Sequence, residues 1–190
     1  LYDSGYPRAL HAFPTRRSSD LPRAGATGNP REGRKVTKTN VVRLLEAAGA
    51  RFSAVEYEVD EDALDAVSVA AKVGRDPDSV FKTLVARTDG GEVAVFVIPG
   101  SCELDLKKAA RVAGGKSLAM VKVAELLGLT GYVRGGCSPL GMRRKYPTFI
   151  DETARLFPDV SVSAGVRGMQ VILSPDDLAA LAGATWADLI

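Results

Sequence analysis

The strongest constraint on the fold is a loop rich in glycine and proline at residues 135–141 (GGCSPLG), which follows a strand-like segment at residues 132–133. Glycine allows positive φ and close backbone approach, whereas proline fixes its own φ, so this composition specifies a defined loop shape. Such a loop can turn backbone N–H groups toward a ligand. A tight turn between two strands is the alternative, and it is the commoner role of these residues. Gly135 and Gly136 are therefore candidate ligand-binding residues, with the turn as the competing interpretation.

Short helical and extended patterns are interspersed around this loop. Apolar residues at helical spacing predict helices at 40–48, 69–73, 104–113, 123–127 and 176–181. Alternating or continuous apolar runs predict strands at 52–59, 80–87, 92–98, 118–121, 148–151, 160–163 and 170–173. Thr39 and Ser68 are candidate helix caps, and residues 89–91 (DGG) give a strong hairpin signal. Because no regular βαβ repeat is present, we predict an α/β (α+β) fold, with a mixed sheet curled toward a barrel and flanked by helices.

The first part of the chain does not share this patterning. Residues 13–21 (FPTRRSSDL) match one reading frame of a common sequencing adapter, and His11 continues the match. We predict that residues 1–36 are an artefactual or disordered leader and that residues 37–190 form the domain. A basic leader or a transit peptide rich in Arg and Ser is the alternative.

Histidine and cysteine restrict the chemistry of the domain. The only histidine is His11, so residues 37–190 exclude Ser-His-Asp and Cys-His nucleophiles and histidine-ligated zinc. Cys102 and Cys137 form neither a disulfide framework nor a metal-ligand spacing, which predicts no metal, no cofactor and a reducing cytoplasm. No apolar run approaches the length needed to cross a bilayer. Catalysis must rely on lysine, carboxylates, hydroxyls, backbone dipoles or the substrate itself.

Charge is distributed unevenly along the domain. The whole chain carries 25 basic and 23 acidic residues, but residues 37–190 carry 18 basic and 20 acidic ones. Residues 107–145 hold many of the basic side chains and a single acid, Glu125. Such a region attracts a polyanion, although residues 107, 108 and 111 can equally form the solvated face of a helix. The acidic segment 56–65 is unsuited to phosphate, and we expect it to lie away from any RNA.

Lys82 lies within a predicted strand, among apolar neighbours. Burying an ammonium group is costly unless the group has a partner or a function. Strand alternation could instead turn the side chain outward to water. The pattern leaves the two interpretations open.

Four motifs occur in order along the domain, at residues 80–84 (VFKTL), 104–108 (LDLKK), 132–141 (YVRGGCSPLG) and 147–151 (PTFID). Together they resemble the YbaK family of free-standing deacylases that clear cysteine from proline tRNA. The resemblance covers residues 39–190. It implies a curled mixed sheet, aminoacyl-tRNA as substrate, no cofactor, no DNA or membrane partner, and prolyl-tRNA synthetase as a possible associate.

The resemblance also implies roles for individual residues. Lys82 matches the essential lysine of the family's Tyr/Phe-Lys-Thr-Leu motif, and Tyr57 matches a substrate-contacting position, although core packing is the commoner role of such a tyrosine. Ser163 begins the family's Ser-Gly-Gly-x-Arg-Gly segment, in which Ala164 replaces the first glycine. Gln170 stands where the family carries aspartate, which puts the contact to the substrate ammonium in question.

The remaining candidates have a competing structural role. Ser138 could hydrogen-bond the substrate near Gly135 and Gly136 or shape the Ser-Pro turn, and for Asp151 we favour helix capping over catalysis. Cys137 is a tempting nucleophile, but no activating neighbour is assigned to it and we favour packing. The candidate tRNA-binding residues are Arg134, Arg143, Arg144 and Lys145.

The family implies a reaction in which the cysteinyl thiol attacks its own carbonyl, forming a cyclic thioester and releasing tRNA. This route suits a domain without histidine, because the ester is already activated and needs positioning and charge stabilisation. One alternative is the related hydrolysis of Ala-tRNA(Pro). Another is an RNA-binding module without catalysis, although the sequence lacks the interleaved aromatics that stack on single-stranded bases.

Overall fold

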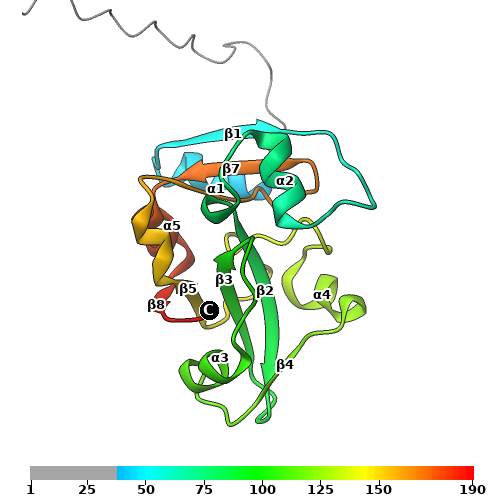
Figure 1. The fold of residues 1–190 in the computed structure, drawn as a ribbon, viewed down its shortest axis with the longest axis vertical. Helices are drawn as coiled ribbons and strands as arrows, with labels where there is room; N and C mark the ends of the chain where they lie inside the picture. The colour runs from blue at the N-terminus through cyan, green and yellow to red at the C-terminus, as the bar shows by residue number, and fades with distance from the viewer. Residues whose placement is uncertain (1–37) are drawn as a thin grey trace, which may run out of the picture. The chain divides into compact units, whose positions relative to one another are not determined.

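Eight strands in two sheets organise residues 38–190, the part of the chain that the computed structural model describes (Figure 1). The five-stranded sheet has the order β4-β2-β3-β5-β8, and the three-stranded sheet has the order β1-β7-β6. The strands of the larger sheet are β2 (Phe81–Thr88), β3 (Val93–Pro99), β4 (Leu118–Met120), β5 (Thr148–Asp151) and β8 (Thr185–Ala187). Those of the smaller sheet are β1 (Phe52–Glu56), β6 (Val160–Ser163) and β7 (Met169–Leu173). The predictions for residues 1–36, including His11, lie outside the described residues.

The larger sheet mixes parallel and antiparallel pairs. β2 pairs antiparallel with β3 and β4, whereas β5 pairs parallel with both β3 and β8. A parallel bridge between Val80 and Ser161 connects the start of β2 to β6, so the two sheets curl around one interior. These observations confirm the predicted mixed α/β architecture with a curled sheet.

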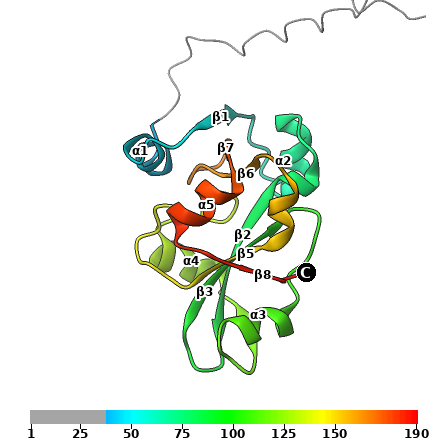
Figure 2. The same cartoon turned by 90° about the vertical axis from the view of Figure 1, so that its left-hand side faces the viewer.

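Five α-helices accompany the sheets: α1 (Asn40–Ala47), α2 (Ala66–Val73), α3 (Leu106–Val112), α4 (Val123–Thr130) and α5 (Pro175–Ala182). Two short 3₁₀ helices are η1 (Pro77–Ser79) and η2 (Glu152–Leu156). Figures 1 and 2 show α1 beside the smaller sheet and α3 beside the far end of the β2–β3 hairpin. None of the helices in the described part of the chain is long and apolar enough to cross a membrane.

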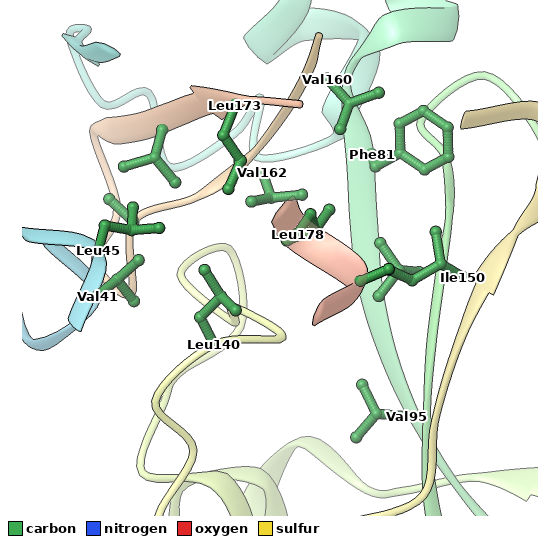
Figure 3. Close-up of a cluster of buried hydrophobic side chains, with 14 of the residues drawn as sticks. Val41, Leu45, Phe81, Val95, Leu140, Ile150, Val160, Val162, Leu173 and Leu178 are labelled. Atoms are coloured by element: carbon green, nitrogen blue, oxygen red, sulfur yellow. The ribbon is translucent and has the colours of Figure 1, made fainter. Parts of the chain in front are cut away.

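Two apolar clusters form the interior. The larger one joins α1, α5, β6 and β7 to one face of β2 and β3, and Figure 3 shows several of its side chains. The smaller one packs α3 against the other face of the β2–β3 hairpin. Both clusters depend on the alternation of β2, whose Phe81 and Val85 belong to the larger cluster and whose Ala86 belongs to the smaller one.

The helix caps follow the sequence with one correction. Thr39 caps α1 as predicted, because its hydroxyl accepts a hydrogen bond from the Val42 N–H. The cap of α2 is Asp65 and not Ser68, since a carboxylate three residues ahead of Ser68 accepts from both its N–H and its hydroxyl. These bonds lower the pKa of Asp65, with the bond from the Ser68 hydroxyl as the largest cause.

Asp151 has the structural role that we favoured. One oxygen of its buried carboxylate accepts from the Thr153 N–H at 3.0 Å and caps η2, while the other accepts from the Leu189 N–H at 2.9 Å.

Two predicted extended segments differ from the structure. β1 ends at Glu56, and residues 132–133 lie outside any strand; the Tyr132 ring packs in the larger apolar cluster and its hydroxyl donates to the Leu140 carbonyl.

Candidate functional site

A cavity of about 860 Å³ opens beside β2. One wall is β2 itself, through residues 81–85, and a second comes from β6 and β7 through Ser163 and Gln170. The glycine-rich loop contributes Arg134, Gly135 and Cys137. Apolar side chains in and just before α4 also line the cavity, namely Met120, Val121, Val123 and Leu126.

Five of the predicted site residues therefore meet in one place. They are Lys82, Arg134, Gly135, Ser163 and Gln170. The structure places the others outside this lining. Those residues are Tyr57, Gly136, Ser138, Arg143, Arg144 and Lys145.

The predicted residues outside the lining differ in their surroundings. Tyr57 follows β1, and its N–H donates to the Gly168 carbonyl at 2.8 Å. Ser138 is fully buried, and its hydroxyl oxygen accepts from the Leu140 N–H, which is the contact expected of a turn residue. The basic residues 143–145 are exposed on the segment after the loop.

Lys82 is half-buried and presents a cation to the cavity. Its Nζ donates to the Gly100 carbonyl at 3.2 Å, and no carboxylate in residues 38–190 forms an ion pair with it. Gly100 also lines the cavity. It follows the end of β3 and lies against Ala66 at the start of α2 and against Val80 just before β2, so the backbone that holds the ammonium group is itself closely packed. A partly desolvated cation without a counter-ion is suited to binding an oxygen-rich, negatively charged group.

The two predicted polar residues from the smaller sheet are buried and hydrogen-bonded. The Ser161 hydroxyl donates to Oε1 of Gln170 at 3.2 Å, which directs the amide nitrogen of Gln170 away from Ser161. The Ser163 hydroxyl oxygen accepts from the Gly165 N–H at 3.2 Å. These bonds hold both side chains at fixed positions in the cavity wall.

The glycine-rich loop needs glycine at two neighbouring positions. Gly135 has φ +82°, and a Cβ there would lie 3.4 Å from Nε of Arg167. A Cβ on Gly136 would lie 3.1 Å from the backbone of Val166 and Arg167. The loop therefore packs directly against the β6–β7 connection, and a side chain at Gly136 would push the two apart.

The acidic segment does not lie where we expected it. Glu61, Asp62 and Asp65 line the same cavity as Lys82, although the sequence suggested that this segment avoids the site. The physical reason is Arg167, whose Nη1 donates to both carboxylate oxygens of Glu61 at 2.8 and 2.6 Å. Its Nε donates to the Arg134 carbonyl at 2.8 Å. One guanidinium thus connects the acidic segment, the glycine-rich loop and the β6–β7 connection at the cavity.

Cys137 has the environment of a packing residue. It contacts the larger apolar cluster, and burial raises the pKa of its thiol to about 12. A thiolate is the nucleophilic form of cysteine, so at neutral pH this side chain is almost entirely unreactive. The preference for a packing role over a nucleophilic one agrees with this pKa.

We expect Cys137→Ala to keep kcat/KM within about threefold of the wild-type value in any reaction at this cavity, because the neutral thiol supplies no nucleophile. Steady-state kinetics at pH 7.5 checks this expectation, with circular dichroism to establish that the variant is folded. A folded variant that has lost activity a hundredfold would contradict it.

The fold that holds this cavity is shared with a known class of proteins. The chain belongs to the aminoacyl-tRNA editing domain family, whose model matches residues 60–181. It is 41% identical over 152 residues to EbsC of Enterococcus faecalis, which is proposed in its name to be a Cys-tRNA(Pro)/Cys-tRNA(Cys) deacylase. This match covers 80% of the present chain and 93% of EbsC.

Two further similarities extend this result. A crystal structure described as a proposed trans-editing enzyme for prolyl-tRNA synthetase superposes with a TM-score of 0.70 at 32% identity, covering 79% of this chain and 94% of that one. A proline–tRNA ligase of Shouchella clausii is 26% identical over 118 residues, which is 62% of this chain and 20% of the ligase.

Proposed function

We propose that this chain is a trans-editing deacylase that removes cysteine from Cys-tRNA(Pro), and from Cys-tRNA(Cys) where the tRNA is not distinguished. The observation that carries the proposal is the cavity, because it combines a backbone-lined loop with a lysine that has no ion pair within residues 38–190, in an aminoacyl-tRNA editing domain. The similarity to EbsC supports cysteine as the amino acid.

The cleavage uses the substrate's own thiol. The sulfur attacks the carbonyl carbon, a C–S bond forms, the C–O bond to the ribose breaks, and the thiol proton passes to the leaving ribose oxygen. A cyclic thioester and free tRNA result. This step requires no protein nucleophile, which fits the neutral Cys137 thiol and the absence of histidine from residues 37–190.

In this scheme Lys82 binds the ribose–phosphate side of the ester and offsets negative charge that develops during attack. Gly135 places backbone against the acyl group, Gly136 lets the loop pack against the β6–β7 connection, and Ser163 and Gln170 form the polar wall opposite β2. Arg134 lines the cavity, while Arg143, Arg144 and Lys145 extend the positive charge along the exposed chain and contact tRNA phosphates.

The partners follow from the same proposal. Aminoacyl-tRNA is the substrate, and prolyl-tRNA synthetase supplies mischarged tRNA directly, an association supported by the relative that is a proline–tRNA ligase. The reaction takes place in the cytoplasm, where the two free cysteines stay reduced.

The test is release of amino acid from preformed Cys-tRNA(Pro), Ala-tRNA(Pro) and S-methyl-Cys-tRNA(Pro). We expect rapid loss of cysteine alone, because alanine has no thiol and the methylated sulfur cannot lose a proton in the attack. Cleavage of the S-methylated substrate would instead establish hydrolysis by water. Salt-sensitive tRNA binding with no cleavage would favour the RNA-binding module.

A further inference from the structure

Thr83 has an unusual hydroxyl group. Its Oγ1 is the one buried side-chain nitrogen or oxygen in residues 38–190 without a hydrogen-bond partner. Leaving a buried hydroxyl unpaired destabilises a folded protein, and native structures contain few such groups. The exception at Thr83 therefore calls for a physical explanation.

The location of Thr83 supplies that explanation. Thr83 is the third residue of β2, directly after Lys82, and it lines the cavity. Strand alternation places Thr83 on the same face as Phe81 and Val85, which point into the larger apolar cluster toward β6 and β7. Lys82 is on the opposite face, so the two side chains approach the cavity from different sides of one strand.

The groups that share the cavity wall with Thr83 have spare donors. Oε1 of Gln170 is occupied by the Ser161 hydroxyl, so the amide NH₂ of Gln170 is the part left for a ligand. The Ser163 oxygen already accepts from Gly165 N–H, which leaves its hydroxyl hydrogen to donate. The Gln170 amide and the Ser163 hydroxyl can thus both donate to an oxygen that only accepts, such as a carbonyl.

We infer that Thr83 is a substrate-binding residue whose hydroxyl donates a hydrogen bond to the carbonyl oxygen of the aminoacyl group. This inference rests on the proposed function. Because the hydroxyl oxygen is buried in the free protein, it reaches a ligand in the cavity by rotation about the Cα–Cβ bond. The bond strengthens as negative charge develops on that oxygen, so Thr83 contributes more to the transition state than to substrate binding.

Thr83→Val separates this role from a structural one, because valine keeps the β-branched shape and removes only the hydroxyl. We expect kcat/KM for Cys-tRNA(Pro) to fall at least about tenfold, mainly through kcat. We expect the melting temperature to stay the same or rise, since an unpaired buried group is removed. Thr83→Ser keeps the hydroxyl and should restore most of the activity.

Thr88→Val is the matched control on the same strand. The Thr88 hydroxyl oxygen accepts from the Glu92 N–H at 3.2 Å and lies outside the cavity lining. This variant should lower the melting temperature and leave kcat/KM within about twofold. The two threonines are thus expected to show opposite effects on stability and activity.

Equal kcat/KM for wild-type protein and folded Thr83→Val, with Cys-tRNA(Pro) cleaved by both, would overturn the assignment while leaving the proposed function intact. If the wild type cleaves no ester, the proposed function fails, and binding of amide-linked 3′-cysteinylamino-3′-deoxyadenosine decides the role of Thr83. This probe retains the carbonyl oxygen. At least fivefold weaker binding by Thr83→Val supports the assignment, and unchanged binding refutes it.

Discussion

Lys82→Ala is expected to lower kcat/KM for Cys-tRNA(Pro) by about a hundredfold or more. The lysine presents a half-buried ammonium to the cavity, and within residues 38–190 it forms no ion pair and one hydrogen bond, to the Gly100 carbonyl. Removing one preorganised group that stabilises developing charge typically costs about 10²–10³ in rate. Because a single hydrogen bond from lysine to a carbonyl is lost, the melting temperature should change little. Single-turnover deacylation measures the effect on the chemical step.

Lys72→Ala provides a matched control for this prediction. Its Nζ also donates to a backbone carbonyl, that of Glu58, at the same distance of 3.2 Å, but it lies outside the cavity lining. The two variants lose the same charge and the same kind of hydrogen bond. If both lose activity equally, the effect of Lys82 comes from net charge and not from its position.

Gly100→Ala is expected to destabilise the fold and weaken the site together. An added Cβ would lie 2.5 Å from the Ala66 Cβ and 2.8 Å from the Val80 carbonyl oxygen, so either α2 or the start of β2 must move. Overpacking of this kind costs about 1–3 kcal/mol. The Gly100 carbonyl is also the acceptor for Lys82, so movement of this backbone displaces the ammonium group. The free energy of unfolding measured with denaturant and the value of kcat/KM should both decrease.

Gly128→Ala is the corresponding control. Gly128 lies within α4, and a Cβ there would meet nothing within 4 Å. Alanine favours the helix by up to about 1 kcal/mol over glycine, so this variant should be more stable than the wild type. Equal stability of Gly100→Ala and wild type would show that the close approach of Gly100 to Ala66 is not required.

Local sequence patterns predicted the strands whose bounds are set by their own residues and not by pairing with a distant strand. The strands at residues 148–151 and 160–163 have the predicted bounds, and the hairpin around residues 89–91 joins β2 to β3. β8 was missed because its three residues form a strand only by parallel pairing with β5, which hydrophobic patterning over so short a run does not reveal.

The site was predictable in part, because local motifs identify residues but not the long-range contacts between them. The composition of the glycine-rich loop identified Gly135, and the resemblance to a family identified Lys82 and Ser163; the fold brings all three to one cavity. The acidic segment was misplaced because its position depends on an ion pair between Glu61 and Arg167, 106 residues apart. Thr83 lies within the motif at residues 80–84, but the lack of a partner for its hydroxyl becomes evident only when the whole interior is assembled.

The bonds of Arg167 also have a consequence for the kinetics of folding. They connect segments near the start and the end of the domain, and β1 likewise pairs with β7. Contacts between residues so distant in sequence require large loops to close and therefore slow folding. During refolding, substrate binding should thus appear in the slowest phase, after the β2–β3 hairpin and its helix α3 have come together.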